Sequence, residues 1–147
     1  MLTWLMPAAL ATAIAVPWQS ADRTAMTAEV IRTGSVILEG VTFEPDRAVL
    51  ARDSDRVLEE LRGMLLEHTE WTFEVQVHTD ESGDREQGRA LSAARADTVV
   101  GWLTSRGIAR ARLVGKGYGS SRPLPVAPAA DPGLQRRRVE LRKLNEE

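Results

Sequence analysis

The sequence predicts an α+β or α/β sandwich, in which one β-sheet carries helices on one face. Apolar and polar residues alternate in several short stretches, as from Phe73 to Val77, and such alternation is typical of half-buried strands. Between two of these stretches, apolar residues recur at helical spacing, at Val57, Leu58, Leu61, Met64 and Leu65. The predicted order along the chain is therefore β-α-β-α-β-β, with a long loop before the last strand.

The strands follow from short alternating stretches and their interruptions. The first is predicted at 36–43 and ends at Pro45, because proline cannot donate to a β-ladder. The others are predicted at 73–77, 113–117 and 139–142. Residues 120–133 contain four prolines and no periodicity, so they predict a surface loop.

The two helices follow from apolar stripes and end signals. The first begins at an N-cap, Asp53 or Ser54, and closes near His68. The second runs from about Arg85 to Arg106, and Gly107 stops it. Its predicted inward-facing residues are Leu91, Ala94, Thr98, Val99, Trp102 and Leu103.

Length and composition indicate one globular domain with a short appendage. The chain has 147 residues, of which 43% are hydrophobic and 27% charged. The formal charge of -2 gives no reason to expect nucleic acid as a partner. Cysteine is absent, which excludes disulfides, cysteine-based metal sites and a lipidated cysteine.

The N-terminal segment 1–23 predicts a hydrophobic export signal or membrane anchor. No charged residue occurs before Asp22, and the centre of the segment is rich in Ala, Leu and Ile. An export signal fits the apolar core, but no basic residue follows Met1. An anchor needs about 20 apolar residues, and Pro7 and Pro17 shorten the run; a truncated or misassigned start is the third alternative. Residues 24–33 are predicted to be a linker, and 34–145 the folded domain.

The loop after the second predicted strand displays two opposite charges. Asp80 lies at the strand's end, and Arg95 shares a helix face with apolar Leu91 and Val99. A charge at such a boundary is either paired internally or reserved for a ligand. Asp80 pairing with Arg95 or capping its loop, and both residues binding a ligand, remain alternatives at this stage.

Catalytic and metal-binding patterns are not evident. His68 and His78 are the only histidines, and neither lies in a known metal-ligand spacing or beside a nucleophile elbow. His78 is interpreted as a hydrogen-bonding residue that stabilises its loop. Residues 136–138 are all arginine, but alternation along a strand would divide them between two faces, which argues against a nucleic-acid patch.

Several motifs in the right order resemble the OmpA-like C-terminal domain, which occurs in outer-membrane proteins, peptidoglycan-associated lipoproteins and flagellar stator proteins. They cover about residues 36–144. The motifs are Val41-x-Phe43, His78-Thr79-Asp80-x-x-Gly83, Leu91-Ser92-x-x-Arg95-Ala96, Gly107-Ile108, Gly117-x-Gly119, Pro123 and Arg137-Arg138-Val139-Glu140.

The resemblance implies an α+β fold with one mixed sheet, and non-covalent binding of the diaminopimelate residue in peptidoglycan stem peptides. By position, Asp80 would meet the ligand's ammonium group and Arg95 its carboxylate. Arg138 would lie near the same pocket, and Phe43 would form one wall. Thr79, Gly88 and Leu91 complete the implied ligand-binding set. No cofactor, metal or catalytic residue is implied.

The chemistry of a zwitterionic ligand agrees with that assignment. Such a ligand needs an anion and a cation a few ångströms apart, and the planar fork of arginine suits a carboxylate. Three departures from the family pattern bear on affinity. Val77 replaces a usual glycine, and Gly88 and Arg136 each replace a usual asparagine.

The sequence thus predicts a non-enzymatic tether between an envelope membrane and the cell wall, with a periplasmic domain associated with the outer membrane. Its membrane contact would be residues 1–23, when these are not cleaved. Two alternatives are a domain that has lost the ligand and serves protein contacts, and an accessory to a cell-wall hydrolase. Diaminopimelate- or lysine-type preference and oligomeric state are left open.

Overall fold

The computed structural model describes residues 22–79, 84–122 and 137–144. The elements in chain order are α1 (Arg23–Thr33), β1 (Ser35–Ile37), α2 (Ser54–Glu67), β2 (Phe73–His78), α3 (Arg85–Thr104), η1 (Arg110–Arg112), β3 (Leu113–Gly119) and β4 (Arg138–Lys143).

The four strands form one mixed sheet in the order β1-β4-β2-β3. β4 pairs antiparallel with both β1 and β2, whereas β2 and β3 are parallel. The parallel pair follows from its connection, since α3 carries the chain back along the sheet before β3 begins. The α+β class and the single mixed sheet are confirmed.

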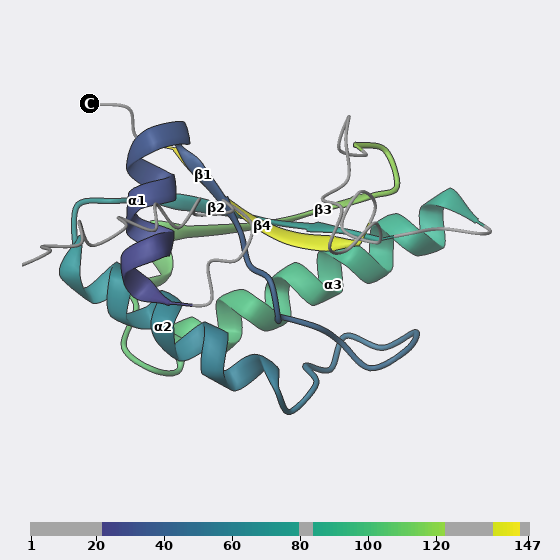
Figure 1. Ribbon diagram of the computed structural model, residues 1–147. Coiled ribbons are helices and arrows are strands. Elements are labelled where there is room, and N and C mark those ends of the chain that lie inside the picture. Colours follow the sequence, from purple (N-terminus) through teal and green to yellow (C-terminus); the bar gives the residue numbers. More distant parts are fainter. Residues whose placement is uncertain (1–21, 80–83, 123–136, 145–147) are drawn as a thin grey trace, which may run out of the picture.

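The core lies between one face of the sheet and the helices, with α2 and α3 beneath the sheet in the view of Figure 1. The sheet contributes Phe73, Val75 and Leu141, which have no exposed surface. From α2, Leu58 and Leu61 are equally buried. The stripe predicted for this helix is therefore its core face.

α3 packs more closely on the sheet than its predicted apolar face would allow. A Cβ atom at Gly117 of β3 would overlap the backbone of Ala93. The buried face of α3 therefore begins with small residues, Ser92 and Ala96, before it becomes apolar. The prediction that Ala94 points inward is wrong, because Ala94 is exposed.

Residues 24–33 are not the predicted linker but most of helix α1. Asp22 caps the helix by accepting a hydrogen bond from the Ala25 N–H at 2.8 Å, and Gly34 ends it at φ +82°. Met26 and Val30, one turn apart, are buried in the core. Two buried residues are too few to give a sustained apolar period, so the sequence did not predict this helix.

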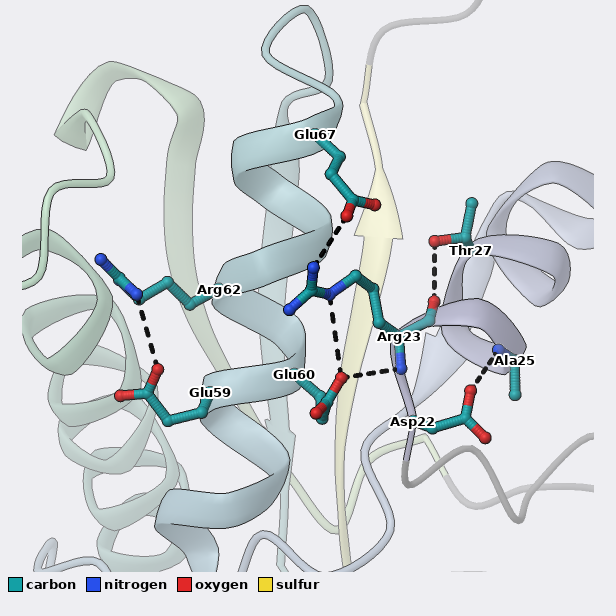
Figure 2. A network of polar contacts seen from close by, with 8 residues as sticks. All are labelled: Asp22, Arg23, Ala25, Thr27, Glu59, Glu60, Arg62 and Glu67. Atoms are coloured by element: carbon teal, nitrogen blue, oxygen red, sulfur yellow. Dashed lines mark hydrogen bonds and ion pairs between the residues drawn. The ribbon is translucent and has the colours of Figure 1, made fainter.

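An arginine clamp fixes the start of α1 to α2. Figure 2 shows Arg23 lying across α2 between Glu60 and Glu67. Its Nη1 lies 2.7 Å from Glu67 Oε1, and its backbone N–H donates to Glu60 Oε2 at 3.1 Å. A Cβ atom at Gly63 would collide with the Arg23 guanidinium, so a glycine at this point of α2 makes room for the clamp.

The structure leaves the predictions for residues 1–21 untested, because they lie outside the described residues. Across residues 22–79, 84–122 and 137–144, no helix has the length and apolar character needed to cross a bilayer.

Candidate functional site

A cavity of about 380 Å³ lies where β2 ends and β4 begins. The chain that follows β1 forms one wall, and a side chain from α3 reaches it from the helix layer. It is lined by Leu38, Glu39, Gly40, Val41, Thr42, Phe43, Pro45, Val77, His78, Arg95, Arg137, Arg138 and Val139. Three predicted ligand-binding residues, Phe43, Arg95 and Arg138, thus share one cavity.

Arg95 is held at the cavity by backbone carbonyls. Its Nε donates to the Arg47 carbonyl at 3.0 Å, and its Nη2 donates to the Glu44 carbonyl at 3.1 Å. Its guanidinium carbon lies 5.0 Å from the centre of the Phe43 ring, within the range of a cation–π contact. These contacts fix the guanidinium and, among the described residues, leave its Nη1 donors without an acceptor.

Burial lowers the pKa of the Arg95 guanidinium, and the negative charge of Asp46 opposes the shift. An arginine keeps its proton under such conditions because its ordinary pKa is above 12. The site therefore presents a partly desolvated cation, which binds an anion more strongly than a fully hydrated one.

The loop that holds Arg95 has a defined shape. Phe43 and Leu50 form an isolated β-bridge across it, and the Glu44 N–H donates to the Val49 carbonyl at 2.8 Å. Asp46 adopts φ 57°, a left-handed conformation that aspartate tolerates better than most residues. The two carbonyls that accept from Arg95 are thereby held in place.

Arg138 and Arg137 both line the cavity, Arg138 from the first position of β4 and Arg137 from the residue before it. Arg138 is buried, and its Nε donates to Glu140 Oε2 at 3.0 Å while its Nη2 donates to the Arg122 carbonyl at 2.9 Å. Alternation places Arg138 on the face away from the helices and Val139 on the helix face. Arg137 is exposed.

Arg137 is a charged lining residue that the predicted ligand-binding set did not include. The motif position pointed to Arg138, which also lines the cavity but is buried, whereas Arg137 is exposed. Which of two neighbouring arginines is exposed depends on the elements packed around them, and that is a tertiary feature. Arg137 is therefore a second cation at the cavity of Arg95.

His78 does not make the predicted loop-stabilising hydrogen bonds. Both ring nitrogens are buried, and within the described structure neither has a hydrogen-bond partner. The ring instead stacks on Tyr118, with centroids 5.2 Å apart and planes 9° apart. Burial, with smaller contributions from Arg138 and Arg122, lowers the pKa of His78 to about 4, so the imidazole is neutral at pH 7.

Three further predicted site residues, Thr79, Gly88 and Leu91, are not among the residues that line this cavity. Thr79 is buried at the end of β2, where its N–H donates to the Gly119 carbonyl at 2.9 Å. Gly88 is buried in α3 and Leu91 is half-buried on it. Asp80 lies outside the described residues, so its predicted role and its pairing with Arg95 are not tested.

The described lining residues include groups that can bind a charged ligand. These are two exposed or partly exposed guanidinium groups and an aromatic ring, and no Ser–His or Cys–His pair occurs among them. Within the described part of the chain, no group of three or more His, Asp or Glu residues is arranged to hold a metal ion.

Comparisons with known proteins give a consistent family. A family model described as the OmpA family matches residues 42–137. The chain is 32% identical over 99 residues to the peptidoglycan-associated lipoprotein of Mesorhizobium japonicum, covering 67% of this chain and 59% of the lipoprotein. It is also 30% identical over 145 residues to Photosystem I P700 chlorophyll a apoprotein A2 of Gloeobacter violaceus, covering 92% of this chain but 16% of that protein.

Among solved structures, a MotB-like protein from Desulfovibrio vulgaris superposes with a TM-score of 0.64 at 26% identity, covering 77% of this chain and 74% of that chain. The chain thus spans less than two thirds of the curated relatives' lengths. The family model nevertheless matches more than half of the 147 residues, including the loop that holds Arg95 and all of α3. On this basis the chain belongs to the OmpA family.

Proposed function

We propose that this domain binds peptidoglycan without covalent chemistry and tethers an envelope membrane to the cell wall. The observation that carries the proposal is the immobilised Arg95 guanidinium at a cavity of about 380 Å³. Membership of the OmpA family and similarity to a peptidoglycan-associated lipoprotein support the same ligand class. The wider role of the protein in the envelope is part of the proposal.

The ligand group we propose is the amino-acid end of diaminopimelate in a stem peptide. Arginine has five N–H donors, and the two that Arg95 gives to carbonyls leave its Nη1 edge for a carboxylate. Arg137 supplies a second positive charge at the same cavity, and Phe43 supplies an apolar wall. Asp80 is the proposed partner of the ligand's ammonium group, on the strength of its motif position alone.

A single site of this kind is expected to bind one stem peptide with modest affinity, and the many stem peptides of the polymer offset this weakness. Each charge-assisted hydrogen bond contributes roughly 1.5–3 kcal/mol net, part of which offsets the entropy lost on association. Peptidoglycan repeats its stem peptide many times, so rebinding retains the domain near the wall. A tether needs this behaviour more than it needs a long-lived single complex.

The proposed location is the periplasmic side of the cell envelope, with outer-membrane association. The residues before Asp22 would direct export or anchor the chain, and the domain would begin at Asp22, the cap of α1. We propose no enzymatic activity, since the cavity presents binding groups without a nucleophile.

Co-sedimentation with purified diaminopimelate-type sacculi tests the proposal. The full chain in mild detergent is expected to pellet with sacculi, and Arg95→Ala and Asp80→Ala are expected to remain in the supernatant. Arg56→Ala is a matched control, because Arg56 is an exposed arginine on α2 outside the cavity. Circular dichroism establishes that each variant is folded.

Failure of the wild type to pellet would refute peptidoglycan binding and leave a fold that serves protein contacts. Loss of binding in Arg56→Ala as well would show general charge attraction rather than a site. A parallel series with lysine-type sacculi tests the diaminopimelate assignment, which predicts weaker retention there.

A further inference from the structure

A second cavity, of about 290 Å³, lies between the first turns of α3 and the turn that follows β3. It shares no lining residue with the cavity of Arg95. It is lined by Arg85, Arg89, Tyr118, Gly119, Ser120 and Ser121.

Hydrogen bonds fix the two walls relative to each other. Ser92 of α3 has no exposed surface, and its Oγ accepts from the Gly119 N–H at 2.9 Å while it donates to the Arg89 carbonyl at 2.9 Å. On the turn, the Ser121 N–H and Oγ both donate to the Tyr118 carbonyl, at 3.1 and 2.6 Å. The backbones of α3 and of the turn after β3 are therefore held at a fixed separation by the α3–β3 packing.

Two arginines give the cavity positive charge. Arg85 and Arg89 lie four residues apart, on one face of α3, and none of the described lining residues is a carboxylate. In the described part of the chain neither guanidinium forms an ion pair, whereas Arg47 and Arg62 pair with glutamates three residues away. The nearby acid Asp84 already accepts a hydrogen bond from the Glu86 N–H at 2.9 Å.

Among the described residues, the guanidinium groups of Arg85 and Arg89 thus give this cavity a local positive charge, in a chain whose formal net charge is -2.

We propose that this second cavity is a binding site for a phosphate monoester. A phosphate monoester carries a charge of about -1.5 to -2 at pH 7 and offers three oxygens, which matches two arginine forks. A carboxylate has one charge and two oxygens, and a single fork satisfies it. The volume is at the lower end for ligand pockets, about 300–1,000 Å³, and so admits a small phosphorylated head group.

Calorimetric titration of the full chain with glycerol 3-phosphate, at constant ionic strength in sodium chloride, tests this site. We expect saturable binding by the wild type. The double variant Arg85→Gln with Arg89→Gln should bind about tenfold more weakly or worse, because it loses both charged forks. The double variant Arg56→Gln with Arg110→Gln removes the same charge from exposed positions outside the cavity and should bind like the wild type.

Absence of saturable binding in the wild type would overturn the proposal, and so would equal loss in both double variants. Phosphatidylcholine vesicles with and without phosphatidic acid identify the source of the phosphate. Retention on the phosphatidic acid vesicles that disappears in the Arg85/Arg89 variant assigns a lipid head group, and binding confined to glycerol 3-phosphate assigns a free ester. Sedimentation with sacculi should be unchanged in that variant, so failure of this site and failure of peptidoglycan binding are seen separately.

Discussion

Arg95 combines a fixed position with donors that remain available to a ligand. Two backbone carbonyls and the Phe43 ring hold its guanidinium, which reduces the side-chain entropy that binding would otherwise cost. Because the holding groups are carbonyls rather than a carboxylate, they orient the cation without neutralising it. The residue is therefore pre-organised for an anion.

Arg95→Lys is expected to weaken retention on sacculi about tenfold or more, with little change in the free energy of unfolding. Lysine keeps the charge but loses the planar fork, so it cannot donate to both carbonyls and to a carboxylate at once. Binding isotherms with sacculi and urea unfolding measure the two quantities. Full retention by the lysine variant would show that charge alone is sufficient.

His78 makes the stability of the domain depend on pH. Its pKa falls from 6.5 in the unfolded chain to about 4 in the folded one. The unfolded state therefore binds more protons as the pH falls from 6.5 to 4, and stability that is complete above pH 6.5 is lost across this window, by up to about 3 kcal/mol. Arg138, Arg122 and the carboxylates of Glu74 and Glu140 surround the same sheet face, so a variant is needed to isolate the effect.

His78→Phe keeps the stacking on Tyr118 and removes the titrating group. We expect its free energy of unfolding at pH 7 to equal or exceed that of the wild type by about 1 kcal/mol, because two buried nitrogens no longer lack partners. Between pH 6.5 and 4 it should lose less stability than the wild type. Chemical denaturation at several pH values measures both, and parallel pH curves would contradict the assignment.

At the scale of elements, the contact of α3 with β3 sets how closely the helix layer approaches the sheet. Gly117→Ala should destabilise the domain by about 1–3 kcal/mol or more, because its Cβ would overlap the Ala93 backbone. Gly101→Ala is the matched control on α3, since open space surrounds that position, and it should stabilise the helix by up to about 1 kcal/mol. Thermal unfolding of both variants gives the comparison; equal effects would mean that the contact is not tight.

α1 is an integral part of the folded unit rather than a connector. Met26→Ala should therefore cost about 2–5 kcal/mol of stability, because Met26 has no exposed surface and its loss leaves a cavity. Ile31→Ala, at a side chain 70% exposed on the same helix, should change stability by less than about 0.5 kcal/mol. Urea unfolding measures the stability of both variants. A small effect for Met26→Ala would support the interpretation of residues 24–33 as a linker.

At the scale of the whole molecule, wall binding should weaken as salt is added. The proposed contacts are charge pairs at a partly open cavity, and raising the ionic strength to 1 M shortens the screening length to about 3 Å. The retained fraction in co-sedimentation is therefore expected to fall steadily with sodium chloride. Retention that is independent of salt would assign the binding to apolar contacts around Phe43 instead.

Patterns with many repeats could be predicted from the sequence, and features that depend on few residues could not. The alternation in β2 and the long stripe of α2 each involve several residues, so burial leaves a readable period. α1 buries only Met26 and Val30, and the packing face of α3 is set by Gly117 on another element. The first signal is too short to show a period and the second lies on another element, so the sequence predicted neither feature.

Some residues of the candidate site could likewise be predicted from the sequence, and others could not. Motif positions identified Phe43 and Arg95, which the structure brings together. The burial of Arg138 beside the exposed Arg137, and the stacking of His78 on Tyr118, depend on how the elements pack around the sheet. That is a property of the assembled fold, and a single strand does not contain it.

The place of β4 between β1 and β2 governs when this domain can fold. β1 has no other strand partner in the described sheet, and β4 comes last of all the strands in the chain. The sheet can therefore form only after β4 has been synthesised, and the pairing of β1 with β4 joins segments about a hundred residues apart. During synthesis from the N-terminus, β1 thus has to wait for its strand partner until nearly all of residues 22–144 have been made.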